Sequence, residues 1–292
     1  MRALDAAVAA LATFAAAGCS NAGVSTGSRG TADAGDSGAG GSAREGFVIG
    51  TTGALQEGTS QTFDSSFIAG FNDAAEVPLG TSCVARRILG CIANTCETAV
   101  GTDAGVASRV HAGIISIQGT KRPVALAPLS NGSYPRIQDD TQTFWSGNET
   151  VTFTALGDRV PAFADTLTAP SQPTITTPAL PSGQPLVIPQ QLALSVSWSG
   201  ATSGTIAITL TRAQTPLKYA TVTCELDAAN GSGELPSAAL QAISSGASGG
   251  TYAFTARTAK NIRAGTYDVR LQLDAIGRTP SGARASGAAT FQ

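Results

Sequence analysis

Apolar and polar residues alternate along four stretches of the chain, which is the period-2 pattern of a strand with one buried and one solvated face. The apolar positions of these stretches are Val151, Phe153 and Ala155; Leu192, Leu194, Val196 and Trp198; Ile206, Ile208 and Leu210; and Tyr267, Val269, Leu271 and Leu273. Turn signals such as Asn230-Gly231 and Gly249-Gly250 separate the stretches. The pattern predicts an all-β protein built from short antiparallel strands.

Helical spacing is rare in the sequence. The segment 236–243 (PSAALQAI) predicts one short helix, because Pro236 suits the first helical turn and Gly246 lies beyond its end. Strands with one wet face bury the other face by closing two sheets on each other. We therefore expect two antiparallel immunoglobulin-like β-sandwich domains.

A proline-rich segment sets the expected boundary between these domains. Half of the 14 prolines fall in residues 161–189. Proline at this density is incompatible with central strands and indicates a linker or edge segments. The predicted division is β-sandwich domain 1 over residues 62–170 and β-sandwich domain 2 over residues 172–292, each of a usual size for a sandwich.

The N-terminal segment has the pattern of an export signal followed by a tether. Residues 6–17 (AAVAALATFAAA) are apolar except for Thr13, and a run of about 12 is too short to span a bilayer but matches the core of a signal peptide. Residues 20–44 are Gly, Ser, Ala, Thr, Asp or Asn at 22 of 25 positions, so they have almost nothing to bury. The sequence predicts a signal peptide over residues 1–18 and a disordered tether over residues 19–44, with a span of roughly 25–30 Å.

The four residues Ala16-Ala17-Gly18-Cys19 resemble the lipobox of bacterial lipoproteins. The resemblance implies cleavage between Gly18 and Cys19, lipid attachment to the sulfur of Cys19, and an anchor of fatty chains such as palmitate. In Gram-negative members of this family, Ser20 after the cysteine implies an outer-membrane location. The alternative is an ordinary secretory signal in which Cys19 carries no lipid.

Three later motifs resemble a β-sandwich unit of uncharacterised lipoproteins from GC-rich Gram-negative bacteria. The motifs are LALSVSWSG, ATVTCELDAANGSGELPSAAL and GTYDVRLQL. The resemblance spans most of residues 62–292 and implies no known activity.

Four cysteines remain once Cys19 is assigned to lipid, and an even number in an exported chain predicts two disulfides. Cys83, Cys91 and Cys96 lie within fourteen residues, whereas Cys224 stands alone. Full pairing must therefore join one of the three to Cys224, across the predicted domain boundary. The alternatives are a buried free thiol at Cys224 and a zinc site that uses the clustered cysteines.

The sequence offers no catalytic site that we can assign. His111 is the only histidine, and we expect it at a strand end or a core margin, because in VHAGIISIQ it alternates with Ile115 and Ile117. Asp139-Asp140 and Glu149 are interpreted as solvated loop residues rather than a carboxylate pair, and Asp227 as turn chemistry rather than calcium binding. We expect no metal and no cofactor.

Charge and composition exclude one class of partner and leave two functions open. Charged residues make up 13% of the chain and the net charge is −2, so there is no basic face for nucleic acid. The expected function is a membrane-anchored cell-envelope lipoprotein with a structural, adhesive or binding role, whose partner is a surface polysaccharide or an envelope protein. The alternative is a carbohydrate-binding module or carbohydrate-active enzyme, with Trp145 as the stacking candidate and Trp198 in the core.

Overall fold

Strands occupy most of the residues that the structure describes, so the all-β prediction is confirmed. The computed structural model describes residues 44–73, 81–98, 109–181, 183–215, 218–244 and 246–292. The signal peptide, Gly18, Cys19 and all of the predicted tether except Arg44 lie outside these ranges. Within them, no helix has the length and apolar character needed to cross a bilayer.

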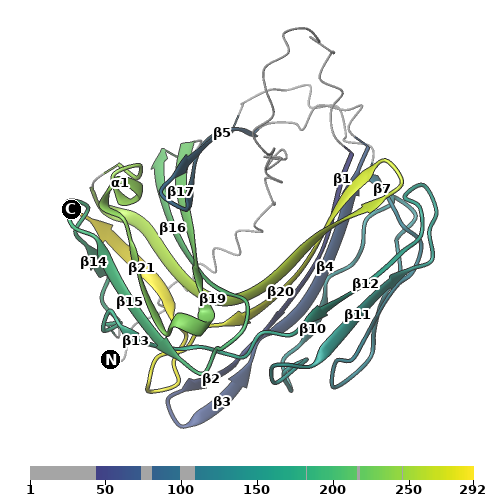
Figure 1. Ribbon diagram of the computed structural model, residues 1–292, viewed down its shortest axis with the longest axis horizontal. Helices are drawn as coiled ribbons and strands as arrows, with labels where there is room; N and C mark the ends of the chain where they lie inside the picture. Colours follow the sequence, from purple (N-terminus) through teal and green to yellow (C-terminus); the bar gives the residue numbers. More distant parts are fainter. Residues whose placement is uncertain (1–43, 74–80, 99–108, 182, 216–217, 245) are drawn as a thin grey trace, which may run out of the picture. The chain divides into compact units, whose positions relative to one another are not determined.

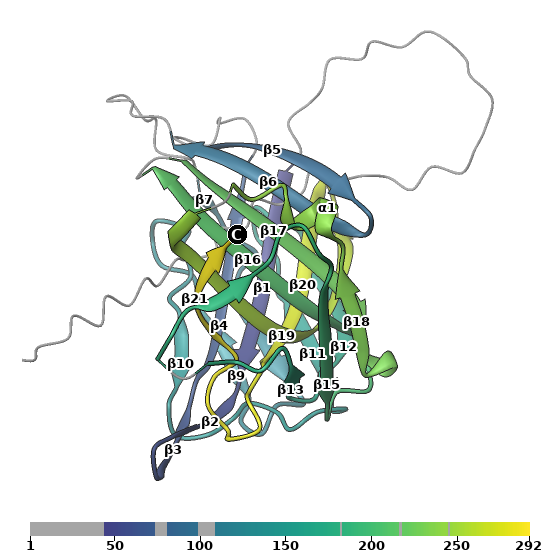
Figure 2. The same cartoon turned by 90° about the vertical axis from the view of Figure 1, so that its left-hand side faces the viewer.

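Twelve of the described strands form one large sheet (Figure 1). Its main path, in spatial order, is β10 (Ile137–Asp139), β4 (Ser65–Asn72), β1 (Arg44–Thr52), β20 (Tyr267–Ile276), β19 (Gly246–Ala264), β16 (Thr205–Thr215), β17 (Lys218–Asp227), β6 (Cys91–Thr98) and β5 (Thr81–Ile88). Beside this path, β7 (Arg109–Val110) pairs with β4, and β21 (Ser286–Phe291) pairs with β19. The strand β14 (Leu186–Ile188), which is labelled in Figure 1, pairs in parallel with β21, which Figure 2 labels near the C-terminus.

Smaller sheets cover the large one. A four-stranded sheet contains β12 (Phe163–Thr168), β11 (Thr150–Ala155), β8 (Ile115–Gln118) and β9 (Val124–Leu126). A three-stranded sheet contains β13 (Thr174–Thr177), β15 (Leu194–Ser199) and β18 (Ser232–Leu235). The remaining elements are the hairpin of β2 (Ala54–Glu57) and β3 (Ser60–Phe63), the 3₁₀ turn η1 (Ala228–Asn230) and the helix α1 (Ser237–Leu240).

Two hydrophobic cores lie on the same face of the large sheet. The first core lies under the four-stranded sheet and includes Val151, Phe153 and Leu273; the second lies under the three-stranded sheet and includes Val196 and Ala275. Leu273 and Ala275 are two residues apart on β20, so their side chains point to the same face of the sheet. Figure 1 shows β11 and β12 beside one half of the large sheet and β13 and β15 beside the other half.

The change from one core to the other falls at the predicted boundary, but the large sheet does not stop there. Ala169 belongs to the first core and Ile175 to the second. However, β6 contributes Cys91 to the second core, and β19 and β20 extend into the first. The chain therefore divides its cores near residues 170–172 while the strands of both halves share one sheet.

The alternating stretches form strands where the sequence predicts them. The inward positions of β11, β15, β16 and β20 are buried, and α1 lies within the predicted helical segment with Pro236 at its N-cap. Leu192 is the exception, because it precedes β15 and is 66% exposed.

The first strand, β1, begins at Arg44, well before residue 62, where the predicted first domain starts. Its core-facing side carries Gly46 and Gly50, so it lacks the apolar alternation that marks the other strands. A Cβ on Gly46 would lie 2.1 Å from Cδ1 of Phe71, and one on Gly50 would lie 2.3 Å from Cε1 of Phe67. The two glycines make room for aromatic rings that β4 places across the strand pair.

Two disulfides join neighbouring strands, as the cysteine count predicts. Cys83 pairs with Cys96 across β5 and β6, and Cys91 pairs with Cys224 across β6 and β17. In both cases the two cysteines lie directly opposite each other in the strand register. Because all four sulfurs are bonded, the alternatives of a free thiol at Cys224 and a cysteine zinc site are wrong.

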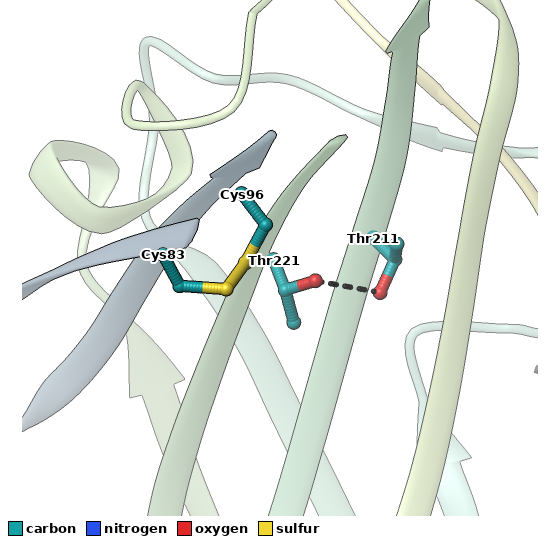
Figure 3. The surroundings of a disulfide bond; sticks show 4 residues. All are labelled: Cys83, Cys96, Thr211 and Thr221. Atoms are coloured by element: carbon teal, nitrogen blue, oxygen red, sulfur yellow. Dashed lines mark hydrogen bonds between the residues drawn. A yellow bond between two sulfur atoms is a disulfide. The ribbon is translucent and has the colours of Figure 1, made fainter. Parts of the chain in front are cut away.

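The disulfides fix β6 from both faces of the sheet. Cys91 and Cys224 lie on the core side, whereas the Cys83–Cys96 bridge lies on the opposite side. Figure 3 shows this bridge near Thr221 and Thr211, whose hydroxyls are 3.3 Å apart across β17 and β16. At this edge of the sheet, β5, β6 and β17 are thus held by covalent bonds in addition to the hydrogen-bonded ladder.

The close fit of Gly50 against Phe67 predicts a destabilised Gly50→Ala variant. The added methyl group would force the ring or the strand to move, at a cost of about 1–3 kcal/mol in the free energy of unfolding. The double variant Gly50→Ala, Phe67→Leu should lose less than the sum of the two single losses, because the smaller side chain leaves room for the methyl. Urea unfolding measures all four proteins, and strict additivity would contradict this packing.

The two disulfides should contribute unequally to stability. The Cys91–Cys224 bridge closes a separation of 133 residues and the Cys83–Cys96 bridge one of 13. In the chain-entropy model these loops correspond to about 5 and about 3 kcal/mol. Paired Cys→Ala variants of each bridge, compared by denaturant unfolding, should show the larger loss for the long loop. An equal or reversed order would contradict this expectation.

Candidate binding cleft

Two adjoining hollows form a cleft at the end of the large sheet where the hairpin β2–β3 projects. Their volumes are about 290 and 550 Å³, and both are lined by Ala54, Gln61 and Arg278. The smaller hollow is bounded by the loop after β20, which contains Gly282, and by Thr174 at the start of β13. The larger is bounded by residues 143–146 and by the segment 170–172. The cleft therefore lies where the chain passes from one core to the other.

Gln172 fixes the wall between the hairpin and the sheet. Its side-chain amide donates to the carbonyl oxygens of Ala54 and Ile276 at 3.1 and 2.9 Å and accepts from the Ala54 N–H at 3.3 Å. The backbone N–H of Gln56 donates to the carbonyl of Gly282 at 2.8 Å, which joins the hairpin to the loop after β20. Three segments that are distant in sequence are thus joined by hydrogen bonds to form the walls of the cleft.

Polar uncharged groups and two cations line the larger hollow. Its polar side chains are those of Thr52, Gln61, Lys121, Thr143, Ser146, Ser171, Gln172 and Arg278. Lys121 Nζ donates to Thr143 Oγ1, and Arg278 Nε donates to Thr174 Oγ1 at 3.2 Å. No carboxylate is among the residues that line either hollow.

Two carboxylates that are close in sequence to the lining residues are paired with other cations. Asp64, which follows β3, pairs with Arg284, and Asp139 pairs with Arg122 at 3.3 Å. Among the described residues, no ion pair involves Lys121. The same holds for Arg278. The two cations of the cleft therefore face it without a carboxylate partner of their own.

The sequence predicted Trp145 as an exposed stacking residue, and this prediction is wrong because Trp145 is buried. Its side chain is in the first core, the residue is 1% exposed, and its indole N–H donates to the carbonyl of Pro170 at 3.2 Å. The ring packs against Phe67 at a centroid distance of 6.0 Å. Trp145 contributes to the floor of the cleft but presents no ring face to a ligand.

A second aromatic residue borders the larger hollow. It is Phe63 at the end of β3, which was not predicted from the sequence. It is partly exposed on the projecting hairpin. The signal in the sequence was an aromatic residue among polar neighbours (QTFDSS), where a core ring is not expected. Trp198, in contrast, lies in the second core as predicted and donates its indole N–H to Ala228.

The other chemically active residues considered from sequence serve local structure. His111 follows β7, and its Nδ1 accepts from the N–H of Gly113 at 3.3 Å. Glu149 accepts hydrogen bonds from the backbone N–H groups of residues 146 and 147, and Asp227 caps η1. These positions match the turn and strand-end roles that the sequence predicts.

Asp139 departs from the predicted solvated loop, since it lies at the end of β10 and is 5% exposed. The Thr141 hydroxyl, and then the Thr141 backbone N–H, lower the pKa of Asp139 through hydrogen bonds, and Arg122 adds to the effect. A carboxyl with a lowered pKa holds no proton at neutral pH, so it is unsuited to act as a general acid. Asp140 next to it is exposed, as expected.

A second polar cluster crosses the sheet face opposite the cores. Arg257 on β19 binds Asp274 on β20 through Nε at 2.8 Å and Nη2 at 3.1 Å, and reaches Glu225 on β17 at 3.4 Å. Gln272 donates to the same Asp274 carboxylate at 2.8 Å and accepts from Arg270. The charges of this cluster are matched within it, so it joins three strands and leaves little capacity for a ligand.

Comparisons with known proteins assign no family. No protein-family model matches the chain, and no curated protein matches its sequence. Among solved structures, the chain is similar to the yeast delta-COP-I mu-homology domain with a TM-score of 0.22 and 8% sequence identity, over 86% of this chain and 98% of that chain. A TM-score of this size establishes neither a shared fold nor a shared function.

Proposed function

We propose that the protein is a membrane-anchored cell-envelope lipoprotein with a non-catalytic binding body. The observation that carries the proposal is the pairing of Cys83 with Cys96 and of Cys91 with Cys224. With these four cysteines bonded to one another, Cys19 has no cysteine within the chain to pair with, and its sulfur is available for lipid. Two disulfides also fit an oxidising compartment outside the cytoplasm.

The proposed mechanism is placement of a rigid body near a membrane. Each buried methylene of an acyl chain contributes about 0.8 kcal/mol, and a single chain binds only marginally, so the three chains of a mature lipoprotein would give stable anchoring. The predicted tether, residues 19–44 less Arg44 of β1, would separate the body from the membrane, and Ser20 favours the outer membrane by the rule of the family that the lipobox resembles. The two cores are the features closest to the two immunoglobulin-like sandwiches expected from the sequence.

A carbohydrate-binding module is the second candidate, and the composition of the cleft favours it. Hydroxyl and amide side chains beside a partly exposed phenylalanine suit a polyhydroxylated ligand. The lining residues include no carboxylate, so the cleft offers no acid and base pair for glycoside hydrolysis. Binding without hydrolysis is therefore the form of this alternative that the geometry supports.

Radiolabelled palmitate tests the anchor in the full chain expressed in a Gram-negative host. The protein should incorporate label and sediment with membranes, whereas Cys19→Ser should incorporate none and move to the soluble fraction. The matched control is the double variant Cys83→Ser, Cys96→Ser. It loses two sulfurs of the folded β-protein but keeps Cys19, so it should still incorporate the label. Absence of label from the unaltered chain, or label that persists in Cys19→Ser, would exclude the lipobox assignment.

A further inference from the structure

The charge of the cleft differs from that of the protein as a whole. The chain carries a net charge of −2, yet the larger hollow is lined by two cations and by no anion. Lys121 and Arg278 come from segments more than 150 positions apart in sequence, and the fold brings both to the rim of one hollow of about 550 Å³. Two cations that share a hollow raise the local concentration of an anionic ligand.

The remaining lining groups narrow the chemical class of that ligand. The hollow is also lined by hydroxyl and amide groups, which both donate and accept hydrogen bonds; they belong to Thr143, Ser146, Ser171 and Gln61. Phe63 supplies a partly exposed aromatic ring that lines the same hollow, and the C–H face of a sugar ring can pack on such a ring. A sugar ring presents both hydroxyls and a C–H face, so these groups fit a saccharide better than an extended apolar peptide.

We propose that the cleft binds an acidic saccharide, with a uronate carboxylate held by Arg278 and Lys121 and a sugar ring packed on Phe63. The guanidinium of Arg278 uses its Nε on Thr174, which leaves the two terminal nitrogens to donate to a carboxylate. Lys121 then supplies a point charge from the wall formed by Thr143. This inference rests on the binding role proposed above and specifies the ligand class of that cleft.

The hollow has a suitable volume and fixed walls. A volume of about 550 Å³ falls within the usual range for ligand sites. Gln172 and the bond from Gln56 to Gly282 hold the hairpin against the sheet, so Phe63 is positioned before a ligand arrives. Preorganisation of this kind reduces the entropy lost on binding.

Isothermal titration of the full chain with a galacturonate tetramer tests the proposal. The tetramer should bind, and its methyl-esterified form, which has the same rings without the charges, should bind at least about tenfold more weakly. Arg278→Gln and Lys121→Gln should each weaken tetramer binding by about tenfold, as expected for loss of one charge-assisted hydrogen bond. Added salt should weaken binding of the acid form and leave the ester unaffected.

A matched control variant distinguishes the effect of a cation in the cleft from the effect of the overall charge of the protein. Arg263→Gln removes one positive charge at an exposed ion pair with Asp268, outside the lining of the cleft, and should leave tetramer binding unchanged. Phe63→Ala should weaken binding of both acid and ester forms, and a melting curve for each variant confirms that it is folded. Oligoglutamate, which carries carboxylates without sugar rings, should bind far more weakly than the tetramer.

Several outcomes would overturn the proposal. They are no binding of the tetramer by the unaltered chain, equal binding of acid and ester, an effect of Arg263→Gln as large as that of Arg278→Gln, and oligoglutamate binding as tight as that of the tetramer. Palmitate labelling does not use the cleft. A labelled protein that fails to bind the tetramer overturns the ligand assignment alone, and a chain that binds but takes up no label overturns the anchor alone.

Discussion

The parallel pairing of β1 with β20 is the interaction on which the rest of the structure depends. It runs along the whole of β1, from Arg44 opposite Tyr267 to Thr52 opposite Ala275. Through β1, the strands β4 and β10 join a sheet whose other members come mostly from the second half of the chain. Without this pairing, the large sheet would end at β20 and the first core would lose Val48 and the rings of β4.

Glycine makes that pairing compatible with a filled core. Gly46 and Gly50 lack side chains on either side of Val48 on the core face of β1, and Phe71 and Phe67 of the neighbouring strand occupy the space. Protein interiors tolerate few voids, so the rings and the glycines must be considered together. The pairing of β1 with β20, in contrast, connects residues more than 200 positions apart, which makes the topology strongly non-local.

The cleft follows from the same architecture. The chain leaves the first core near Ala169 and enters the second at Ile175, and the intervening segment runs past the end of β20 and the hairpin β2–β3. Gln172, in that segment, binds backbone groups of both β2 and β20. A boundary that looks like a linker in the sequence is, in the structure, a wall of the candidate site.

The local pattern predicted the strands in which apolar and polar residues alternate regularly, such as β11, β16 and β20. The even number of cysteines that remain after Cys19 predicted a bridge to Cys224. The local pattern missed β1, because two of its buried positions are glycines. It also wrongly predicted an exposed Trp145, because burial of that ring depends on Phe67 and on the Pro170 carbonyl. The cleft escaped prediction for a related reason. No motif marks Lys121 or Arg278 in the sequence, and both line one hollow only because the fold brings distant segments together.

The most direct test of the shared sheet uses the two tryptophans, since Trp145 lies in the first core and Trp198 in the second. The variants Trp145→Phe and Trp198→Phe leave one fluorescent reporter in each core, and urea unfolding is followed for both, with circular dichroism as a reference. If one sheet couples the cores, both reporters should show the same dependence on urea after correction for the stability of each variant. Two separate transitions, one for each core, would contradict the account.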